Sequence, residues 1–257
     1  MVAPVRAEEP PTVEVSGGGE IGGHLWSAYT NTTVVLSGWL AGVPKSIRED
    51  GWRLRAGAGY WRMQGRFGSG FPTQSDPRPK YKKWGSTAEL LLGYHATFGA
   101  LTVKAYAGLE HVVLGSVHID RSGTYDDLEL QFGTGELGAK AIIESWYNLT
   151  PYVFAQLDMS WGSRVEAFGT RLRLGYRFSP GLAVGPEMSR HIADNAAIWG
   201  FQNYGFARVS DSRDSLTRYG GFVRYEWSAG EISASAGLTD DADDNGFYAT
   251  LNALLRF

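Results

Sequence analysis

The residues of this chain that could support hydrolysis are serines and histidines that lie close together in the sequence. Ser116 lies between His111 and His118, and Ser189 lies two residues before His191. A lipid-modifying hydrolase would need a serine nucleophile, a histidine base and an acidic or amide partner. These spacings match no nucleophile motif, and scattered histidines are usually interfacial or loop residues. We therefore expect no catalytic residues and no enzymatic activity.

A short acidic segment near the C-terminus is a second candidate for chemistry. Its carboxylates are hard oxygen ligands of the kind that bind Ca²⁺, but their spacing is not that of an EF-hand loop. The candidate ligands are Asp240, Asp241, Asp243 and Asp244. Such loops are more often only solvated, so the sequence leaves a metal site undetermined. The chain has no Cys, which excludes thiolate ligands and disulfides, and we expect no cofactor.

The largest set of chemically capable residues consists of charged side chains that alternate with apolar ones. Arg53 and Arg55, for example, alternate with Trp52, Leu54 and Ala56. Successive side chains of a β-strand point to opposite faces, so each such segment would have one charged and one apolar face. The residues expected on the charged face are Arg53, Arg55, Glu89, Lys104, Glu110, Lys140, Glu144, Asp158, Arg171, Arg173, Arg177, Glu187, Arg224 and Glu226.

The elements that position these charges are predicted to be the strands of a membrane barrel. A soluble sandwich also alternates, but aromatic residues gather at the strand ends, as in the girdles of membrane barrels. The last strand alternates up to a terminal Phe257. We expect an all-β, transmembrane, antiparallel up-and-down barrel in the bacterial outer membrane, in contact with lipid and recognised by the barrel assembly machinery through Phe257. The aromatics assigned to the girdles include Trp26, Tyr29, Trp52, Tyr60, Trp84, Tyr94, Trp146, Trp161 and Trp227.

Composition agrees with this interpretation. The mean hydropathy is -0.22, and no segment approaches the roughly 18 consecutive apolar residues of a membrane-spanning helix. Strands that alternate between lipid and lumen do not need such a segment. The net charge is only -3 and has no basic stripe, which argues against nucleic acid as a partner.

Gly, Pro, Asn and Asp divide the chain into about twelve strands, with fourteen or ten as alternatives. Short turns are expected at 98–100, 148–150, 179–181 and 228–230, and long loops at 65–81, 119–127, 192–216 and 240–245. Pro186 removes a ladder donor and predicts a bulge or a break. The expected strands are 20–29, 32–41, 51–65, 82–97, 101–118, 128–147, 151–162, 165–178, 181–192, 217–228, 231–239 and 246–257.

Residues 1–19 lack periodicity and contain three prolines and three consecutive glycines, Gly17 to Gly19. We expect them to form a flexible periplasmic tail, and the barrel to occupy 20–257. No signal-peptide pattern precedes the tail, so we expect that a signal peptide has been removed.

The nearly balanced charges of the inner face have two interpretations. They could pair and fill a narrow lumen, or they could line a hydrated path for a solute. We favour the first, because twelve strands leave a limited bore and an unpaired buried charge costs several kcal/mol. From the sequence alone, a lumen change such as Arg173→Gln is expected to be milder than Leu174→Arg or Ala105→Arg on the lipid face.

Several stretches resemble the BcsS family of alphaproteobacterial cellulose biosynthesis proteins. They are 25–29 with 34–42, 50–60, 92–94, 106–110, Val184-Gly185-Pro186-Glu187, and 219–222 with 233–237. The similarity runs in order through nearly all of 20–257. It implies an accessory role in exopolysaccharide production, with no catalytic residues to transfer.

The resemblance favours a non-enzymatic outer-membrane component of a cellulose or exopolysaccharide biosynthesis and secretion system. Such a protein would act in export, anchoring or organisation of the polymer at the cell surface, with β-glucan and other secretion components as candidate partners. The alternatives are a small-solute channel and, third, a lipid-modifying hydrolase. Residues suited to sugar contact, which could equally be girdle or loop-packing residues, are Tyr81, Trp84, Trp199, Phe201, Asn203 and Tyr204.

Overall fold

The structure, a computed structural model, describes residues 10–22, 25–36, 46–66, 80–119, 131–132, 135–164, 167–193, 214–241 and 245–257. Within these ranges no helix is long and apolar enough to span a membrane. The strands are β1 (Val13–Gly22), β2 (Leu25–Val35), β3 (Gly51–Arg66), β4 (Lys80–Phe98), β5 (Leu101–Ile119), β6 (Gln131–Phe132), β7 (Glu136–Asn148), β8 (Val153–Gly162), β9 (Ala167–Arg177), β10 (Leu182–Ala193), β11 (Asp214–Trp227), β12 (Gly230–Asp241) and β13 (Asn245–Arg256).

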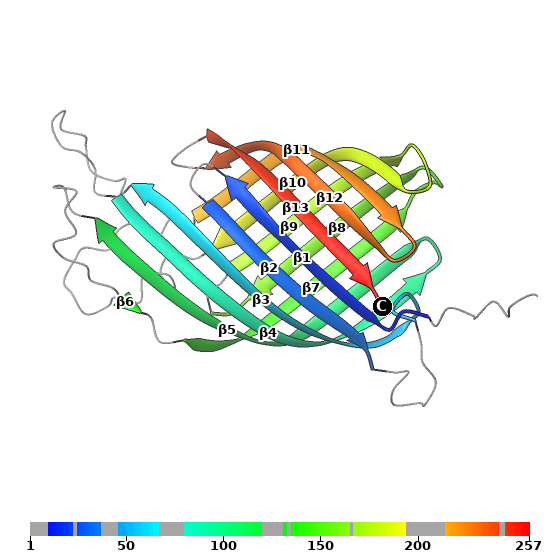
Figure 1. Cartoon of the computed structure of the whole chain (residues 1–257), viewed down its shortest axis with the longest axis horizontal. Coiled ribbons are helices and arrows are strands. Elements are labelled where there is room, and N and C mark those ends of the chain that lie inside the picture. Colours follow the sequence, from blue (N-terminus) through cyan, green and yellow to red (C-terminus); the bar gives the residue numbers. More distant parts are fainter. Residues whose placement is uncertain are drawn as a thin grey trace, which may run out of the picture.

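These strands form a closed antiparallel barrel (Figure 1). Their order is β4-β3-β2-β1-β13-β12-β11-β10-β9-β8-β7-β5, and the β4–β5 pairing closes the ring. The two-residue β6 pairs with Gly115 and Ser116 of β5, past the point where β7 leaves that strand. β6 and β7 therefore extend the same part of the wall, and the prediction of a twelve-stranded up-and-down barrel is confirmed.

Burial is inverted relative to a soluble sandwich. Leu90, Leu109 and Leu172 are at least half exposed on the outer face, whereas Arg173 and Glu187 are buried on the inner face. Only an apolar solvent makes this arrangement favourable, because outward leucines then lie in lipid and inward charges can pair with one another.

Aromatic pairs mark both ends of the outer face. Trp26, the second residue of β2, lies beside Tyr60 of β3 toward one end of the barrel, with ring centroids 5.1 Å apart. Trp52 and Tyr94 lie near the other end, 5.4 Å apart. The assignments of Tyr29 and Trp146 to the girdles are wrong, since both side chains line the lumen.

The connections differ between the two ends of the barrel. We call the end at which β13 finishes the C-terminal mouth. The connections there are short at 99–100, 149–152, 178–181 and 228–229, close to the four predicted turns. Gly99 has a φ of 61°, a left-handed conformation that glycine adopts without a steric penalty. The β2–β3 connection is the long exception at this mouth.

The first hairpin is displaced from its predicted position by about seven residues. β1 begins at Val13, so Gly17 to Gly19 are part of a wall strand and the barrel begins before residue 20. The consecutive glycines are typical of a linker, but Gly18 has a packing role here. A Cβ at Gly18 would collide with Asn252 and the Tyr29 ring, which meet above it. Residues 1–9, the rest of the predicted tail, lie outside the described residues.

Pro186 interrupts one ladder, as the sequence predicts. The β9–β10 pairing stops after Val184↔Tyr176 and resumes at Glu187↔Arg173. Two residues are skipped on each strand, so this is a break without an inserted residue.

Candidate functional site

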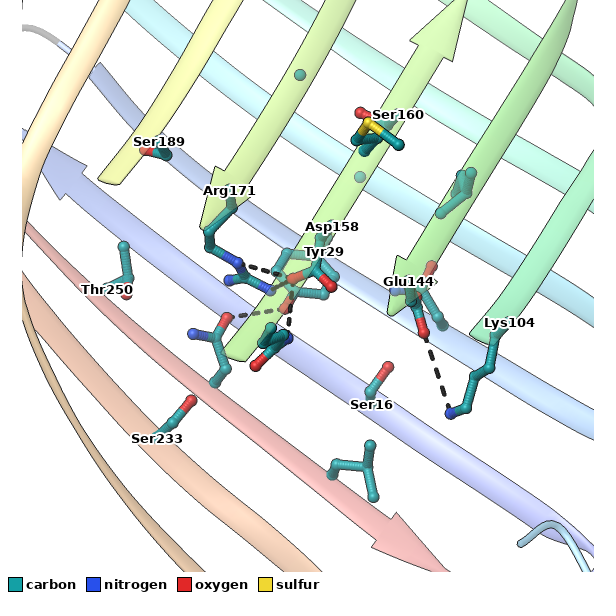
Figure 2. A pocket seen from close by; sticks show the side chains of 18 of the residues that line it. Ser16, Tyr29, Lys104, Glu144, Asp158, Ser160, Arg171, Ser189, Ser233 and Thr250 are labelled. Carbon is teal, nitrogen blue, oxygen red and sulfur yellow. Dashed lines mark hydrogen bonds and ion pairs between the residues drawn. The ribbon is translucent and has the colours of Figure 1, made fainter. Parts of the chain in front are cut away.

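The lumen contains a cavity of about 610 Å³ whose lining includes side chains from every one of the twelve wall strands. This volume lies in the range of roughly 300–1,000 Å³ that is usual for small-molecule sites. The cavity extends from Arg256 and Glu231, at the C-terminal mouth, to Ser160 and His191, close to the opposite strand ends. Figure 2 shows its central part.

All the charged residues predicted for the inner face lie at inward positions of the wall strands. Ten line the cavity: Arg55, Glu89, Lys104, Lys140, Glu144, Asp158, Arg171, Arg173, Glu187 and Arg224. The other four pack around it. Arg53 and Glu110 are buried, Arg177 lies over the Phe154 ring, and Glu226 contacts Arg224.

Ion pairs cross the lumen near the C-terminal mouth. Arg55 of β3 binds Glu144 of β7 at 2.7 Å, and Lys104 of β5 binds Glu14 of β1 at 3.3 Å. β3 and β7 are three strands apart in the ring, and β5 and β1 are four apart, so these pairs join walls that are not adjacent. We call this group, with Arg224, Glu231 and Arg256, the ion-pair belt. Each member lies within four residues of the strand end at the C-terminal mouth.

The belt continues into further pairs on both sides. Arg256 binds Glu14 at 3.4 Å, and Arg224 binds Glu231 at 2.5 Å. In the other direction Arg55 also binds Glu89, which Lys140 then links to Glu110 at distances of 3.2–3.3 Å. Acids and bases alternate along this chain, so each buried charge has an opposite charge beside it.

A short segment, 46–50, lies beneath the belt at the C-terminal mouth. Arg53, only 1% exposed, donates to the carbonyls of Ile47 at 3.3 Å and of Glu49. Ile47 is 3% exposed, and its N–H donates to the Pro11 carbonyl at 2.6 Å. Arg48 donates to the carbonyl of Ser228 in the β11–β12 turn at 2.7 Å. The segment is thus held in place by contacts with Arg53, near the start of β3, and with the turn between β11 and β12.

An aromatic layer fills another part of the same end. Trp146 stacks on Phe154 with centroids 3.9 Å apart, and Phe154 lies 6.2 Å from Phe222. The guanidinium groups of Arg177 and Arg224 cover these rings, at 4.8 Å from Phe154 and 4.4 Å from Trp146. The belt, segment 46–50 and this layer together place ion-paired and stacked side chains across the C-terminal mouth.

This arrangement leads to a prediction about conductance. The purified protein in a planar lipid bilayer is expected to show little or no steady current, because ion-paired side chains reach across the lumen at this mouth. Reversing two belt charges, as in Lys104→Glu with Arg55→Glu, should destabilise the barrel, because Glu14 and Glu144 would then face like charges. A stable, ohmic, large-conductance pore in the unmodified protein would contradict the prediction.

Known structures of similar shape are outer-membrane barrels. The chain is similar to the transport unit of the autotransporter AIDA-I from Escherichia coli, with a TM-score of 0.54, 10% identity, and coverage of 100% of this chain and 93% of that one. It is similar to the translocator domain of the autotransporter NalP from Neisseria meningitidis, with a TM-score of 0.52, 10% identity, and coverage of 98% and 90%. A TodX variant, a monoaromatic hydrocarbon channel, gives a TM-score of 0.50, 11% identity, and coverage of 96% and 90%. At these identities the similarity shows the fold alone.

A comparison with curated proteins gave no significant match. The family model described as cellulose biosynthesis protein BcsS matches residues 22–199, more than half of the chain. The chain belongs to the BcsS family. It is therefore an outer-membrane β-barrel associated with cellulose biosynthesis.

Several lumen residues of this BcsS family member were missed by the sequence patterns. Glu14 and Glu20 were assigned to a tail and to a strand start, because the first hairpin was misplaced. Arg218 binds Glu20 through two nitrogens, and Glu231 and Arg256 complete the belt. Each of them alternates with outward-facing residues, and this alternation is the sequence pattern that could have identified them.

A second buried network lies on the wall between β9 and β13. Arg173 pairs with Glu187, and Ser235 bonds to both at 3.0 Å. The Tyr248 hydroxyl donates to Glu187 at 3.3 Å, passing over Gly220, where a Cβ would meet that hydroxyl. The inward glycine thus makes room for a contact between strands that are not adjacent.

The serine and histidine candidates whose side chains the structure describes lie on two different faces of the barrel wall. His111 lies on the outer face of β5, whereas Ser189 and His191 face the lumen from β10. Ser116 and His118 lie in β5.

The other site candidates of the sequence lie partly in the described residues. Trp84 lies on the outer face, over Gly115, and Tyr81 lies in β4. Asp240 and Asp241 end β12, and the described residues contain no cluster of three or more potential metal ligands. The candidates outside the described residues are Trp199, Phe201, Asn203, Tyr204, Asp243 and Asp244.

Proposed function

We propose that this protein is a non-enzymatic outer-membrane component of a cellulose or related exopolysaccharide system, and that it holds or organises the polymer at the cell surface. The observation that carries the proposal is the ion-pair belt, which joins non-adjacent walls at the C-terminal mouth. Membership of the BcsS family supports the link to cellulose, and the ion-pair belt favours anchoring or organisation over passage of the polymer through the lumen.

A threading glucan chain would have to separate pairs that join opposite walls. Displacing Arg55 from Glu144, or Lys104 from Glu14, would leave charges unpaired in a narrow lumen. Separating such partly buried pairs carries a free-energy penalty, because each charge loses its partner in a lumen that hydrates it less well than bulk water does. Continuous passage of polymer would require that penalty at several pairs together.

The orientation in the membrane follows from the lengths of the connections. Barrels of this class have short periplasmic turns and longer extracellular loops. We therefore assign the C-terminal mouth to the periplasm, where the barrel assembly machinery would engage Phe257. The connections after Arg66 and after Ala193 leave the opposite mouth and would be extracellular. The connection after Ala193 carries the candidate sugar contacts Trp199 and Tyr204, so polymer contact would occur at this mouth.

A small-solute channel is the second candidate, favoured by the polar cavity of about 610 Å³. It differs from the preferred function in requiring an open path, which the conductance measurement tests.

The test in cells is to measure cell-associated and secreted glucan in strains that carry single changes. Shortening the 192–216 or 65–81 loop should reduce polymer retention while the barrel still folds, because changes in loop length have a small effect on stability. Ser116→Ala, Ser189→Ala, His111→Ala and His118→Ala should leave the amount of polymer unchanged, because no nucleophile is involved.

Outer-membrane abundance of each variant is the control for this experiment. Loss of polymer in the serine or histidine variants at normal abundance would instead favour an enzyme. Unchanged polymer retention in both loop variants would remove the support for contact at the extracellular rim.

A further inference from the structure

The lumen holds, at the ion-pair belt and directly above it, a group of side chains that are exposed to the cavity and fixed in place. Tyr29 is 41% exposed, and the side chains of Arg171 and Glu144 are 35% and 33% exposed. All three line the cavity, as does Asp158, so the surface they expose is lumenal. Figure 2 shows these four residues projecting from β2, β7, β8 and β9 into the same space.

Tyr29 presents an aromatic surface in a fixed orientation. Its hydroxyl donates to Asn252 Oδ1 at 2.7 Å, across the intervening strand β1. The ring lies over Gly18, where a Cβ would be 2.9 Å from a ring carbon. One face of the ring is thus supported by backbone, and the exposed surface faces the cavity. A ring held in this way offers apolar contact area with little loss of conformational entropy on binding.

The polar groups beside Tyr29 are also preorganised. Arg171 donates to Asp158 Oδ2 from Nε at 3.0 Å and from a terminal nitrogen at 2.6 Å. Gln156 donates to the same oxygen at 2.9 Å. Glu144 is held by Arg55. Guanidinium groups donate and carboxylates accept, and a sugar hydroxyl can do both.

The charge balance of the group selects against a charged ligand. Asp158 is paired with Arg171, and Glu144 with Arg55 and Lys104. An anionic ligand would compete with these carboxylates for the bases, and a cationic ligand would compete with these bases for the acids, so either would have to separate existing ion pairs. A neutral ligand rich in hydroxyl groups can form hydrogen bonds to the cavity-facing atoms of these ion pairs without separating them.

We propose that Tyr29, Arg171, Asp158 and Glu144 form a lumenal binding site for a short neutral oligosaccharide. Tyr29 supplies the stacking surface, and the ion-paired groups bind the hydroxyls. The inference rests on the proposed function and deepens it. The ligand is one end of a neutral glucan chain, which enters from the mouth opposite the belt and ends at this site.

The test uses the full chain in a detergent without a sugar headgroup, with cellotriose as the neutral probe and trigalacturonate as the anionic one. Calorimetric titration is expected to show cellotriose binding and weaker or no trigalacturonate binding. Tyr29→Ala should weaken cellotriose binding about tenfold or more, a change of about 1.4 kcal/mol. Tyr29→Phe, which keeps the ring, should bind within about threefold of the unmodified protein.

Tyr60→Ala is the matched control, because Tyr60 lies on the neighbouring strand β3 and points outward. It should bind like the unmodified protein. If Tyr29→Ala does not fold, Tyr29→Leu replaces it, since leucine keeps apolar volume but has no aromatic face. Absence of cellotriose binding, equal loss in the Tyr29 and Tyr60 variants, or tighter binding of trigalacturonate would each overturn the proposal.

Polymer assays in the same variants separate this inference from the proposed function. Loss of cellotriose binding in Tyr29→Ala with unchanged surface glucan would uphold the lumenal site and count against a role for it in polymer retention. If loss of the protein lowers surface glucan but the purified protein does not bind cellotriose, the proposed function would be upheld and the lumenal site refuted.

Discussion

Arg173→Gln is expected to destabilise the folded barrel by about 3–5 kcal/mol, because it leaves the Glu187 carboxylate buried without its charge partner. The side chains of Arg173 and Glu187 are 5% and 3% exposed. Arg173 also lies 4.9 Å from the Phe222 ring and donates to Ser235. Urea unfolding of the barrel in phospholipid vesicles measures the change. The structure thus corrects the expectation, from alternation alone, that this lumen substitution is mild.

A double variant and a surface control make this prediction specific. Arg173→Gln combined with Glu187→Gln should recover part of the lost stability, because no unpaired charge remains. Arg190→Gln, at an exposed outward position on β10, leaves no buried carboxylate without a partner and should cost less than Arg173→Gln. If Arg173→Gln and Arg190→Gln had equal effects, the Arg173–Glu187 pair would not be buried as described.

Leu172→Arg is expected to cost about 2–4 kcal/mol, because it places a charge in lipid near the middle of the membrane. Leu172 is 50% exposed on the outer face and lies at the centre of β9. The penalty falls toward the interfaces, so Leu174→Arg and Ala105→Arg, closer to the C-terminal mouth, should cost less than Leu172→Arg.

The same unfolding assay checks this series, with Leu172→Met as the control for loss of the native side chain. Equal tolerance of arginine at Leu172 and Leu174 would contradict the depth assignment. Tolerance at both positions would contradict the lipid-facing assignment of β9.

Alternation made most of the barrel predictable, because the sequence of each strand shows which of its residues face lipid and which face the lumen. The segment 165–178 is an example: Arg171, Arg173 and Arg177 alternate with leucines and aromatics, and β9 has that register. The first hairpin was not predictable in the same way. Gly18 permits contact between Tyr29 and Asn252, which are 223 residues apart. A contact between residues so far apart in the sequence cannot be predicted from a local pattern.

The sequence could indicate a charged lumen but not how it is closed. Lys104 of β5 reaches Glu14 of β1, four positions away in the ring, and Arg48 reaches the Ser228 carbonyl 180 residues away. Such partners are set by the closure and shear of the barrel, which bring distant strands to the same level. The balanced charge of the inner face is therefore visible in the sequence, whereas the belt and segment 46–50 become visible only in the fold.

The location of the polymer in a strain that lacks this protein tests the central claim most directly. Glucan is measured separately in the periplasm, on the cell surface and in the medium, with the unmodified gene restored as the control. If the barrel retains polymer at the surface and does not conduct it, deletion should lower cell-associated glucan and raise glucan in the medium, with little glucan in the periplasm. Accumulation of glucan in the periplasm would show that the polymer passes through this barrel and would contradict the account.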